Sequence, residues 1–398
     1  MRRKIFLTCG LLFALLGSIL FLRVVSRGVG IFQSIPLSAR YDFSPATPKP
    51  LNPAPVMSNK LTQTAWIPDW DFAKGMQSLK QSYRNFDNIS PVWYYLEKDG
   101  KVREAKKGLD EMLKFTAENN LKLIPSIASF DPTHVGVVFE DPEKVKRHVE
   151  YLLDEVEKYD FAGLDIDYEA IYYHHQPGYL SMLRQLYEAL DKQGKILSVT
   201  VLSKWTDQAL GIGLMETRST QDWFAISEVA HEVRIMAYEV TATVSESPGP
   251  ISPVPWVEAI LRYATTRIPR EKVVLAIHLY AYDGWSQNLD YVSPYQGFIN
   301  PYLDKFQADA ITYADVLKKL PKAKRQFMDE ISKEKILIYT DKDIFDKTGD
   351  SDADYILMYQ DAETMQYRID LAKEFGIAGV AHWRMGGEDL RVYPLAKK

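Results

Sequence analysis

The sequence has little cysteine, no metal-binding histidine motif and no dense block of positive charge. Its single cysteine, Cys9, lies in an apolar run, which excludes disulfide frameworks and cysteine-based zinc or iron–sulfur sites. The seven histidines show no H-E-x-x-H spacing, so the sequence gives no support to a zinc protease site and no cofactor is expected. Lys and Arg number 48 against 53 Asp and Glu, and basic residues cluster only at the extreme N-terminus. Because nucleic-acid phosphates require a dense basic face, no nucleic-acid partner is expected.

One long hydrophobic run is present, close to the N-terminus. The basic residues Arg2, Arg3 and Lys4 precede an uncharged segment, Ile5–Leu22, that would reach roughly 27 Å as a helix, close to the thickness of a bilayer core. The sequence therefore predicts a signal-anchor or transmembrane segment over residues 1–27, with the rest of the chain outside the cytoplasm, or a secreted protein if the segment is cleaved. Residues 28–60 are rich in proline and predict an extended linker.

Beyond this linker, short apolar strands alternate with amphipathic helical patterns. Eight strands joined by helices are typical of a (β/α)₈ TIM barrel, here expected over residues 61–398. A doubly wound open α/β sheet is the alternative, although no G-x-G-x-x-G follows the first strand. The expected strands are Thr64–Trp70, Ile89–Tyr95, Leu121–Ala128, Ala162–Tyr168, Ile196–Leu202, Val233–Tyr238, Val273–Tyr280 and Ile377–Trp383.

The last two expected strands start about 100 residues apart, whereas the other strands start about 25 to 40 residues apart. This longer interval predicts a small α+β insertion between strand 7 and its helix, over residues 283–354.

Three acidic residues alternate along the fourth expected strand. Asp165, Asp167 and Glu169 point to the same side because strand side chains alternate, and Leu164 and Ile166 between them indicate a strand buried on both sides. Repulsion among the three carboxylates should keep at least one protonated near neutral pH, as a glycosidase acid requires. A Mg²⁺ or Ca²⁺ site and a structural hydrogen-bonding role are the alternatives.

The segment that holds these acids resembles a known signature. Phe161–Glu169 resembles the D-G-x-D-x-D-x-E motif on strand four of glycoside hydrolase family 18, the chitinase-like family, and Met236–Glu239 is similar to the M-x-Y-D that ends strand six. Pro253–Trp256 with Val273–Asp283 resemble the approach to strand seven, and Ile377–Asp389 resembles strand eight with its tryptophan. The resemblance spans about residues 64–395 and is nearest to exported bacterial members.

The resemblance implies roles for individual residues. Glu169 would be the general acid and base, Asp167 and Asp165 would support it, and Tyr238 would bind the substrate's acetamido group, which itself acts as nucleophile. Trp383 would stack under a sugar. Glu239, Trp66, Trp93 and Tyr359 would also contact substrate, and Trp70 is a further aromatic candidate. No metal is implied.

Two positions depart from the family pattern. Ala162 stands where the first Asp is expected and Glu239 where the family has Asp. The resemblance implies an exported hydrolase of β-linked N-acetylglucosamine polysaccharides, such as chitin or peptidoglycan, acting with retention. A carbohydrate-binding protein with little catalysis and an anchored component of a cell-wall machine are the alternatives, the first suggested by Ala162 and the second by the proline-rich linker.

Overall fold

The structure is a computed structural model that describes residues 60–206, 218–242, 244–245, 248–285, 306–340 and 354–397. The expected membrane segment (residues 1–27) and all but the last residue of the expected linker (28–60) lie outside these ranges. Within the described ranges, no helix is long and apolar enough to cross a bilayer.

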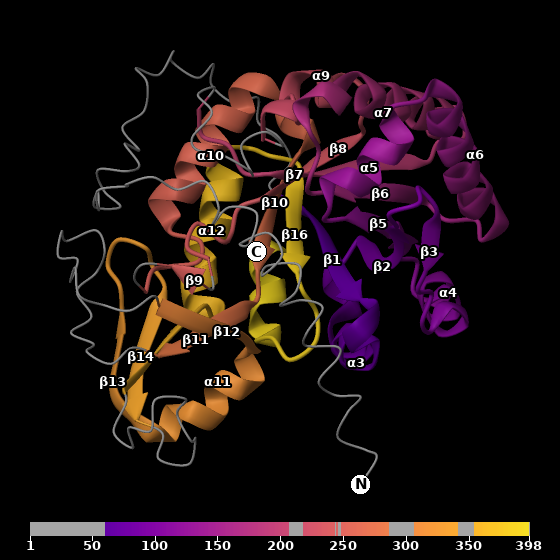
Figure 1. The fold of residues 1–398 in the computed structure, drawn as a ribbon. Helices are drawn as coiled ribbons and strands as arrows, with labels where there is room; N and C mark the ends of the chain where they lie inside the picture. The colour runs from indigo at the N-terminus through magenta and orange to yellow at the C-terminus, as the bar shows by residue number, and fades with distance from the viewer. Residues whose placement is uncertain are drawn as a thin grey trace, which may run out of the picture.

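Eight parallel strands form a closed barrel (Figure 1). Strand β1 pairs with β16 on one side and with β2 on the other, which closes the ring, so the doubly wound open sheet is wrong. Each expected strand is present, although the third is split into the two-residue β4 (Lys122–Leu123) and β5. A short β3 (Val102–Glu104) pairs antiparallel with β2. The barrel strands are β1 (Thr62–Pro68), β2 (Asn88–Leu96), β5 (Ser126–Ser129), β6 (Gly163–Tyr168), β7 (Ile196–Leu202), β8 (Glu232–Met236), β10 (Val273–His278) and β16 (Gly379–Trp383).

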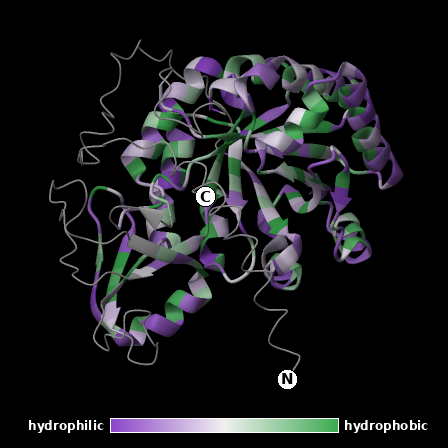
Figure 2. Cartoon of the chain, viewed as in Figure 1, coloured by the Kyte–Doolittle hydropathy of each residue, from purple (hydrophilic) through white to green (hydrophobic). Residues whose placement is uncertain are grey.

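Helices surround the barrel and bury one face against it. In α6 (Pro142–Lys158), Asp141 accepts a hydrogen bond from the Glu143 N–H and caps the helix, with proline at the first helical position. Figure 2 shows the outer side of this helix as largely hydrophilic. The other described helices around the barrel are α3 (Phe72–Ser82), α4 (Leu109–Glu118), α5 (Pro132–Phe139), α7 (Gln176–Asp191), α9 (Trp223–Glu228), α10 (Val254–Arg267) and α12 (Ala362–Glu374). Short 3₁₀ helices are η1 (Asp69–Asp71), η2 (Tyr83–Asn85), η3 (Tyr173–His175), η4 (Arg270–Lys272), η6 (Leu320–Lys322) and η7 (Leu390–Lys397).

A second, antiparallel sheet lies beside the barrel, at the lower left of Figure 1. All of its strands but β9 come from the segment of the chain between β10 and α12. These strands begin at Tyr280 and end at Tyr359, so the inserted segment is wider on both sides than the expected 283–354. A capping box between Thr312 and Asp315 starts its helix, α11 (Tyr313–Lys319). Its strands, in spatial order, are β13 (Ala323–Met328), β14 (Lys335–Thr340), β15 (Asp354–Tyr359), β11 (Tyr280–Trp285), β12 (Phe306–Thr312) and β9 (Val244–Ser245).

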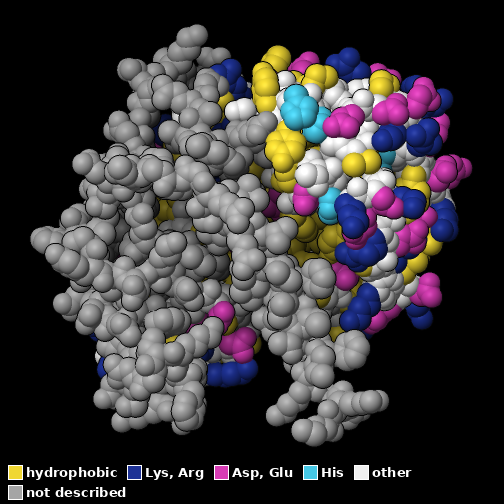
Figure 3. Space-filling model, viewed as in Figure 1, with side chains coloured by type: hydrophobic (Ala, Val, Ile, Leu, Met, Phe, Trp, Pro, Cys, Tyr) yellow, Lys and Arg dark blue, Asp and Glu magenta, His cyan; other side chains and the backbone are white. Residues whose placement is uncertain are grey.

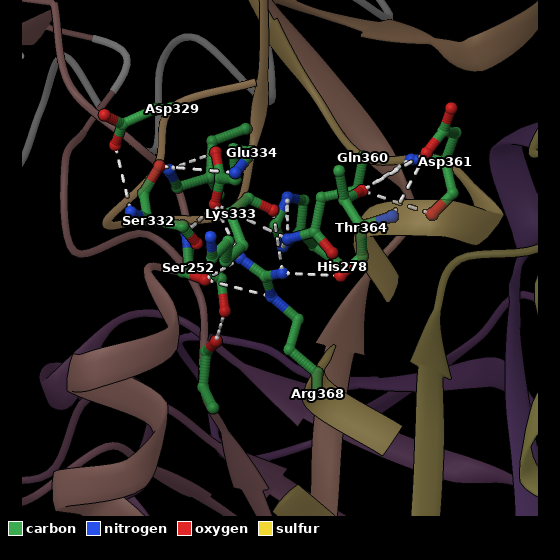
Figure 4. Close-up of polar contacts among 12 residues, drawn as sticks. Ser252, His278, Asp329, Ser332, Lys333, Glu334, Gln360, Asp361, Thr364 and Arg368 are labelled. Carbon is green, nitrogen blue, oxygen red and sulfur yellow. Dashed lines mark hydrogen bonds and ion pairs between the residues drawn. The ribbon is translucent and has the colours of Figure 1, made fainter. Parts of the chain in front are cut away.

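A buried polar network joins this sheet to the barrel (Figure 4). The Arg368 guanidinium of α12 and the Glu334 carboxylate before β14 form an ion pair at 3.4 Å, with both side chains fully buried. Glu334 also accepts the backbone N–H groups of Ile251 and Ser252 at 3.0 and 2.6 Å, and Ser252 Oγ donates to the Ala237 carbonyl at 2.5 Å. Because Ala237 immediately follows β8, the network fixes the chain at the end of that strand.

The barrel has two apolar regions of different composition. A large core between strands and helices contains the outward side chains, such as Leu164 and Ile166 of β6. The interior holds a small cluster that includes Trp66, Val92 and Ala128, packed against Trp383. Over the described part of the face shown in Figure 3, Lys and Arg side chains are interspersed with Asp and Glu.

Candidate active site

Strand β6 places the expected acids in a column inside the barrel. Its register sets Asp165 opposite Ser126 and Asp167 opposite Ala128 of β5, and the Glu169 N–H donates to the Ser129 carbonyl at 2.8 Å. Leu164 and Ile166 point the other way, into the core beneath the helices. The strand therefore directs the acids to the C-terminal mouth of the barrel, where TIM-barrel enzymes have their active sites.

Asp165 is the deepest acid and is surrounded by donors. Its side chain has 0% exposure and accepts hydrogen bonds from Trp66 Nε1 at 3.1 Å, Ser126 Oγ at 2.6 Å and Thr200 Oγ1 at 3.0 Å. The Arg234 guanidinium lies 3.4 Å away. These partners come from β1, β5, β7 and β8, so Asp165 is held by the barrel walls although Ala162 supplies no carboxylate.

Asp167 and Glu169, higher in the column, bind protons more tightly than free acids do. Burial, then the charges of Glu169 and Asp165, raises the pKa of Asp167 well above its ordinary value, while Arg234 opposes the shift. Burial, then the charge of Glu239, raises the pKa of Glu169 to about 8. Burial and the charge of Glu239, rather than repulsion from the other two acids of β6, thus favour the protonated form of Glu169 near neutral pH.

One carboxyl oxygen of Asp167 is available to accept a hydrogen bond from a ligand. Within the described part of the chain, no group donates a hydrogen bond to Asp167 Oδ1, although this atom is buried. A buried carboxyl oxygen without a donor is costly unless a ligand or water supplies one. The arrangement therefore leaves a place for a ligand N–H or O–H between the column and the mouth of the barrel.

Tyr238 and Glu239 follow the end of β8. The Tyr238 ring is half-buried and lies 6.3 Å from the His278 ring and 6.4 Å from the Tyr280 ring, between centroids. Burial, then the charges of Glu169 and Asp167, raises the pKa of Tyr238 well above its usual value, so its hydroxyl remains a donor. Glu239 is exposed, has a φ of 62° and accepts the Tyr280 hydroxyl at 2.8 Å.

Trp383 ends β16 at the mouth of the barrel and is half-buried. Its ring makes edge contacts with those of Trp66 and Trp70, at centroid distances of 6.1 and 6.3 Å. Trp70, in the first βα segment, is 57% exposed. Trp383 and Trp70 together present aromatic surface at this end of the barrel, of the kind that packs against sugar rings.

The burial of three other aromatic residues corrects the expectation that they contact substrate. Trp66 is 2% exposed and uses its indole N–H to hold Asp165 and Ser126. Trp93 is 0% exposed and packs in the core between barrel and helices. Tyr359 is 3% exposed and lies in the core of the second sheet. The sequence pattern did not predict on which side of its strand each of these rings lies.

Three further residues shape the site and were not identified from the sequence. Arg234 lies beneath the column, Tyr280 holds Glu239, and Tyr95 at the end of β2 donates to Asp69 Oδ1 at 2.5 Å. An arginine between Val233 and Ile235 in an apolar strand was a usable signal for Arg234, because a buried charge requires a partner. The Tyr280 and Tyr95 contacts depend on long-range packing.

The donor set argues against the metal alternative. Asp165 is saturated by hydrogen-bond donors and an adjacent guanidinium, a setting that repels cations, and Asp167 and Glu169 favour their protonated forms. Among the described residues there is also no group of three or more His, Cys, Asp or Glu side chains arranged to hold a metal ion.

Comparison with known proteins agrees with this geometry. The sequence model of glycosyl hydrolases family 18 matches residues 73–388, most of the chain. The chain belongs to glycosyl hydrolase family 18. A cortical fragment-lytic enzyme of Bacillus subtilis (strain 168) is 23% identical over 283 residues, which cover 70% of this chain and 60% of that protein. The match thus spans less than two thirds of that relative's length.

Solved structures share the fold. The spore cortex-lytic enzyme SleL of Bacillus megaterium QM B1551 superposes with a TM-score of 0.70 at 19% identity, covering 87% of this chain and 75% of that one. A chitinase from Chromobacterium violaceum ATCC 12472 also reaches 0.70, at 16% identity, covering 85% and 98% of the two chains. At these identities the likeness shows the barrel architecture.

Proposed function

We propose that this protein is a glycosidase that hydrolyses β-linked polysaccharides containing N-acetylglucosamine, of the chitin or peptidoglycan type, with retention of configuration and assistance from the substrate's acetamido group. The observation that carries the proposal is the raised pKa of Glu169, about 8, beside a second carboxyl, Asp167, whose pKa is also raised. A protonated carboxyl at the mouth of the barrel is what cleavage of a glycosidic bond requires.

The first step breaks the glycosidic bond. Glu169 donates its proton to the leaving oxygen while the acetamido carbonyl oxygen attacks the anomeric carbon from the opposite face, forming a cyclic oxazolinium ion. The Tyr238 hydroxyl donates to that carbonyl oxygen and orients it. Asp167 accepts the acetamide N–H through an oxygen such as Oδ1, for which no donor is found among the described residues.

The second step releases the product. Glu169, now ionised, removes a proton from water, and the resulting hydroxide oxygen attacks the anomeric carbon and reopens the ring. The acetamido group and the protonated Glu169 are thereby restored. Two inversions at one carbon give net retention.

Several features support the choice of substrate class. Trp383 and the exposed Trp70 offer aromatic surface next to the carboxylate column. Relatives in sequence and structure include proteins named as cortical fragment-lytic or spore cortex-lytic enzymes and as chitinases. Both names point to N-acetylated glycans, and we propose that class as the substrate of this chain.

The proposal includes a location outside the cytoplasm. The uncharged run Ile5–Leu22 after a basic cluster is typical of a membrane anchor or an export signal, and we propose that it places the barrel on the outer side of the membrane. Added protease should then degrade the barrel in whole cells or spheroplasts. Protection of the barrel would contradict export.

The experiment that tests the activity is incubation with a panel of N-acetylated glycans followed by mass spectrometry of the products. The panel contains chitin oligosaccharides, peptidoglycan fragments and their de-acetylated counterparts. Products from at least one N-acetylated glycan and none from its de-acetylated counterpart are expected. Cleavage of de-acetylated chains alone would contradict the proposal.

A further inference from the structure

A fully buried arginine lies beneath the carboxylate column. Arg234 of β8 has 0% side-chain exposure, and its Nη1 lies 3.4 Å from Asp165 Oδ2. The same nitrogen donates to Ser90 Oγ of β2 at 2.8 Å, and Nε donates to Glu232 Oε1 at 2.9 Å. The guanidinium therefore spans the barrel interior from β8 to β2 and β6.

The surroundings of Arg234 direct its charge toward Asp165. Its guanidinium carbon lies 5.2 Å from the centroid of the Trp66 ring, whose N–H donates to the same Asp165 oxygen. The Glu232 carboxylate, at the start of β8, is 14% exposed. It offsets part of the positive charge of the guanidinium from the side away from the column. A cation in a low-dielectric interior acts strongly on the carboxylate that it faces.

The guanidinium acts more strongly on the acid at the bottom of the column than on the acid at its top. Asp165 meets the guanidinium directly, whereas Glu169 is four residues further along the chain at the mouth of the barrel. The cation therefore favours negative charge at the bottom of the column more than at the top. After burial and the charge of Glu169, the charge of Asp165 contributes to the raised pKa of Asp167, the next acid in the column.

We propose that Arg234 is a positioning residue of the active site: its buried guanidinium, held by Ser90 and Glu232, stabilises negative charge on Asp165 at the bottom of the carboxylate column. The inference rests on the proposed function, because it takes Glu169 as the general acid. It assigns to Arg234 an electrostatic part in the reaction beyond its hydrogen bonds within the barrel.

Other groups face the column and must be considered in any pH profile. Burial, then the charge of Arg368, lowers the pKa of His278 well below its ordinary value, so this ring stays neutral near neutral pH. The remaining ionisable groups around the column are Asp69 of η1, Tyr95 of β2, Tyr179 of α7, Glu232 of β8, Tyr238 and Glu239 after β8, and Tyr280 of β11.

The test compares the pH dependence of kcat/KM on tri-N-acetylchitotriose for wild type and four variants. Arg234→Gln removes the cation, and Arg234→Gln with Glu232→Gln also removes the second carboxylate paired with Arg234, so that Glu232 is not left without its partner. Arg234→Lys retains the charge. Ser90→Ala removes a neutral hydrogen-bond partner of Arg234 and serves as the matched control.

The acidic limb of the profile reports the carboxylate that must be ionised. In the neutral variants it should move to higher pH by about one unit or more, because an adjacent guanidinium ordinarily lowers a carboxyl pKa by about that amount. Arg234→Lys and Ser90→Ala should keep the wild-type limb. A folded neutral variant with an unmoved acidic limb, whatever its activity, would overturn the proposal and leave Arg234 a structural residue.

Two further readouts keep the test decisive. If the neutral variants fail to fold, a displaced limb in Arg234→Lys or Ser90→Ala would overturn the proposal, and unmoved limbs in both would support it. If wild type cleaves no N-acetylated glycan, the proposed function fails, but the Arg234 assignment is still tested by carbon-13 NMR titration of labelled aspartate carboxyls. The proposal requires the Asp165 resonance, assigned by its loss in Asp165→Asn, to titrate at higher pH in a folded neutral variant than in wild type, and an unchanged titration would overturn it.

Discussion

Tyr280 donates its hydroxyl to Glu239 Oε1 at 2.8 Å, and this contact joins the second sheet to the mouth of the barrel. Tyr280 is the first residue of β11, and Glu239 follows Tyr238 at the end of β8. The charge of Glu239 helps to raise the pKa of Glu169. The second sheet therefore fixes the position of a charge that acts on the proposed catalytic acid.

Replacement of Glu239 should shift the basic limb of activity. The loss of protonated Glu169 should cause kcat/KM of wild type to fall near pH 8. Glu239→Gln removes a neighbouring negative charge, which lowers the pKa of Glu169 and moves this limb to lower pH. The pH profile of kcat/KM measures the shift, and Glu118→Gln on the exposed surface of α4 is the matched control. A limb that moves upward or equally in both variants would contradict the assignment.

The proposed acid should reduce the stability of the fold near neutral pH. The pKa of Glu169 is raised from 4.5 to about 8 in the folded protein, so between these values the unfolded chain releases a proton that the folded chain keeps. Stability should therefore fall as pH rises through this window. Glu169→Gln should be more stable than wild type at pH 7 by about 1 to 3 kcal/mol, with the difference lost below pH 4.5. Urea unfolding at pH 4 and pH 7 measures both values, and an equal difference at the two would refute the assigned proton.

Much of this site could be read from local sequence pattern, because alternation along one strand needs no long-range information. The side shared by Asp165, Asp167 and Glu169 follows from strand geometry, and the closed barrel follows from eight strands separated by helices. The aromatic residues were less predictable. Trp93 lies on the outer side, as alternation from the interior Val92 requires, but the register of β2 against β5 shifts between Val92 and Tyr94, so Tyr94 also packs in the outer core, which one sequence does not reveal.

Contacts between distant segments also lay beyond the sequence pattern. Arg234 meets Asp165 and Ser90 only because the barrel closes and brings β8, β6 and β2 around one interior. Glu239 meets Tyr280 because the second sheet packs against the barrel. The identity of each residue hinted at a buried partner, but the partner itself is set by the tertiary fold.

Trp383 and Trp93 should respond differently to substitution. Trp383→Ala removes aromatic surface at the mouth of the barrel, so KM for an N-acetylated oligosaccharide should rise several-fold, as expected from the loss of about 0.5–1.5 kcal/mol of ring packing. Trp93→Phe, in the core, should lower the melting temperature with little change in KM. Steady-state kinetics and thermal unfolding of both variants separate the effects. A raised KM in Trp93→Phe alone would contradict the placement of the two rings.

Removal of metal ions should leave activity intact. Asp165 is occupied by three hydrogen-bond donors and lies next to Arg234, and the proposed nucleophile belongs to the substrate. Turnover after dialysis against EDTA should equal turnover before it. Loss of activity on chelation that Mg²⁺ or Ca²⁺ restores would instead place a cation at the carboxylates.

The most direct test of the proposed mechanism is the turnover of Glu169→Gln beside wild type on one N-acetylated oligosaccharide and its de-acetylated counterpart. General acid catalysis is worth about 10²–10⁴-fold, so Glu169→Gln should lose that much kcat while it keeps its fold by circular dichroism and most of its affinity for sugar. Wild type should leave the de-acetylated oligosaccharide uncleaved. Undiminished turnover by a folded Glu169→Gln protein, or equal cleavage of both oligosaccharides by wild type, would contradict the mechanism.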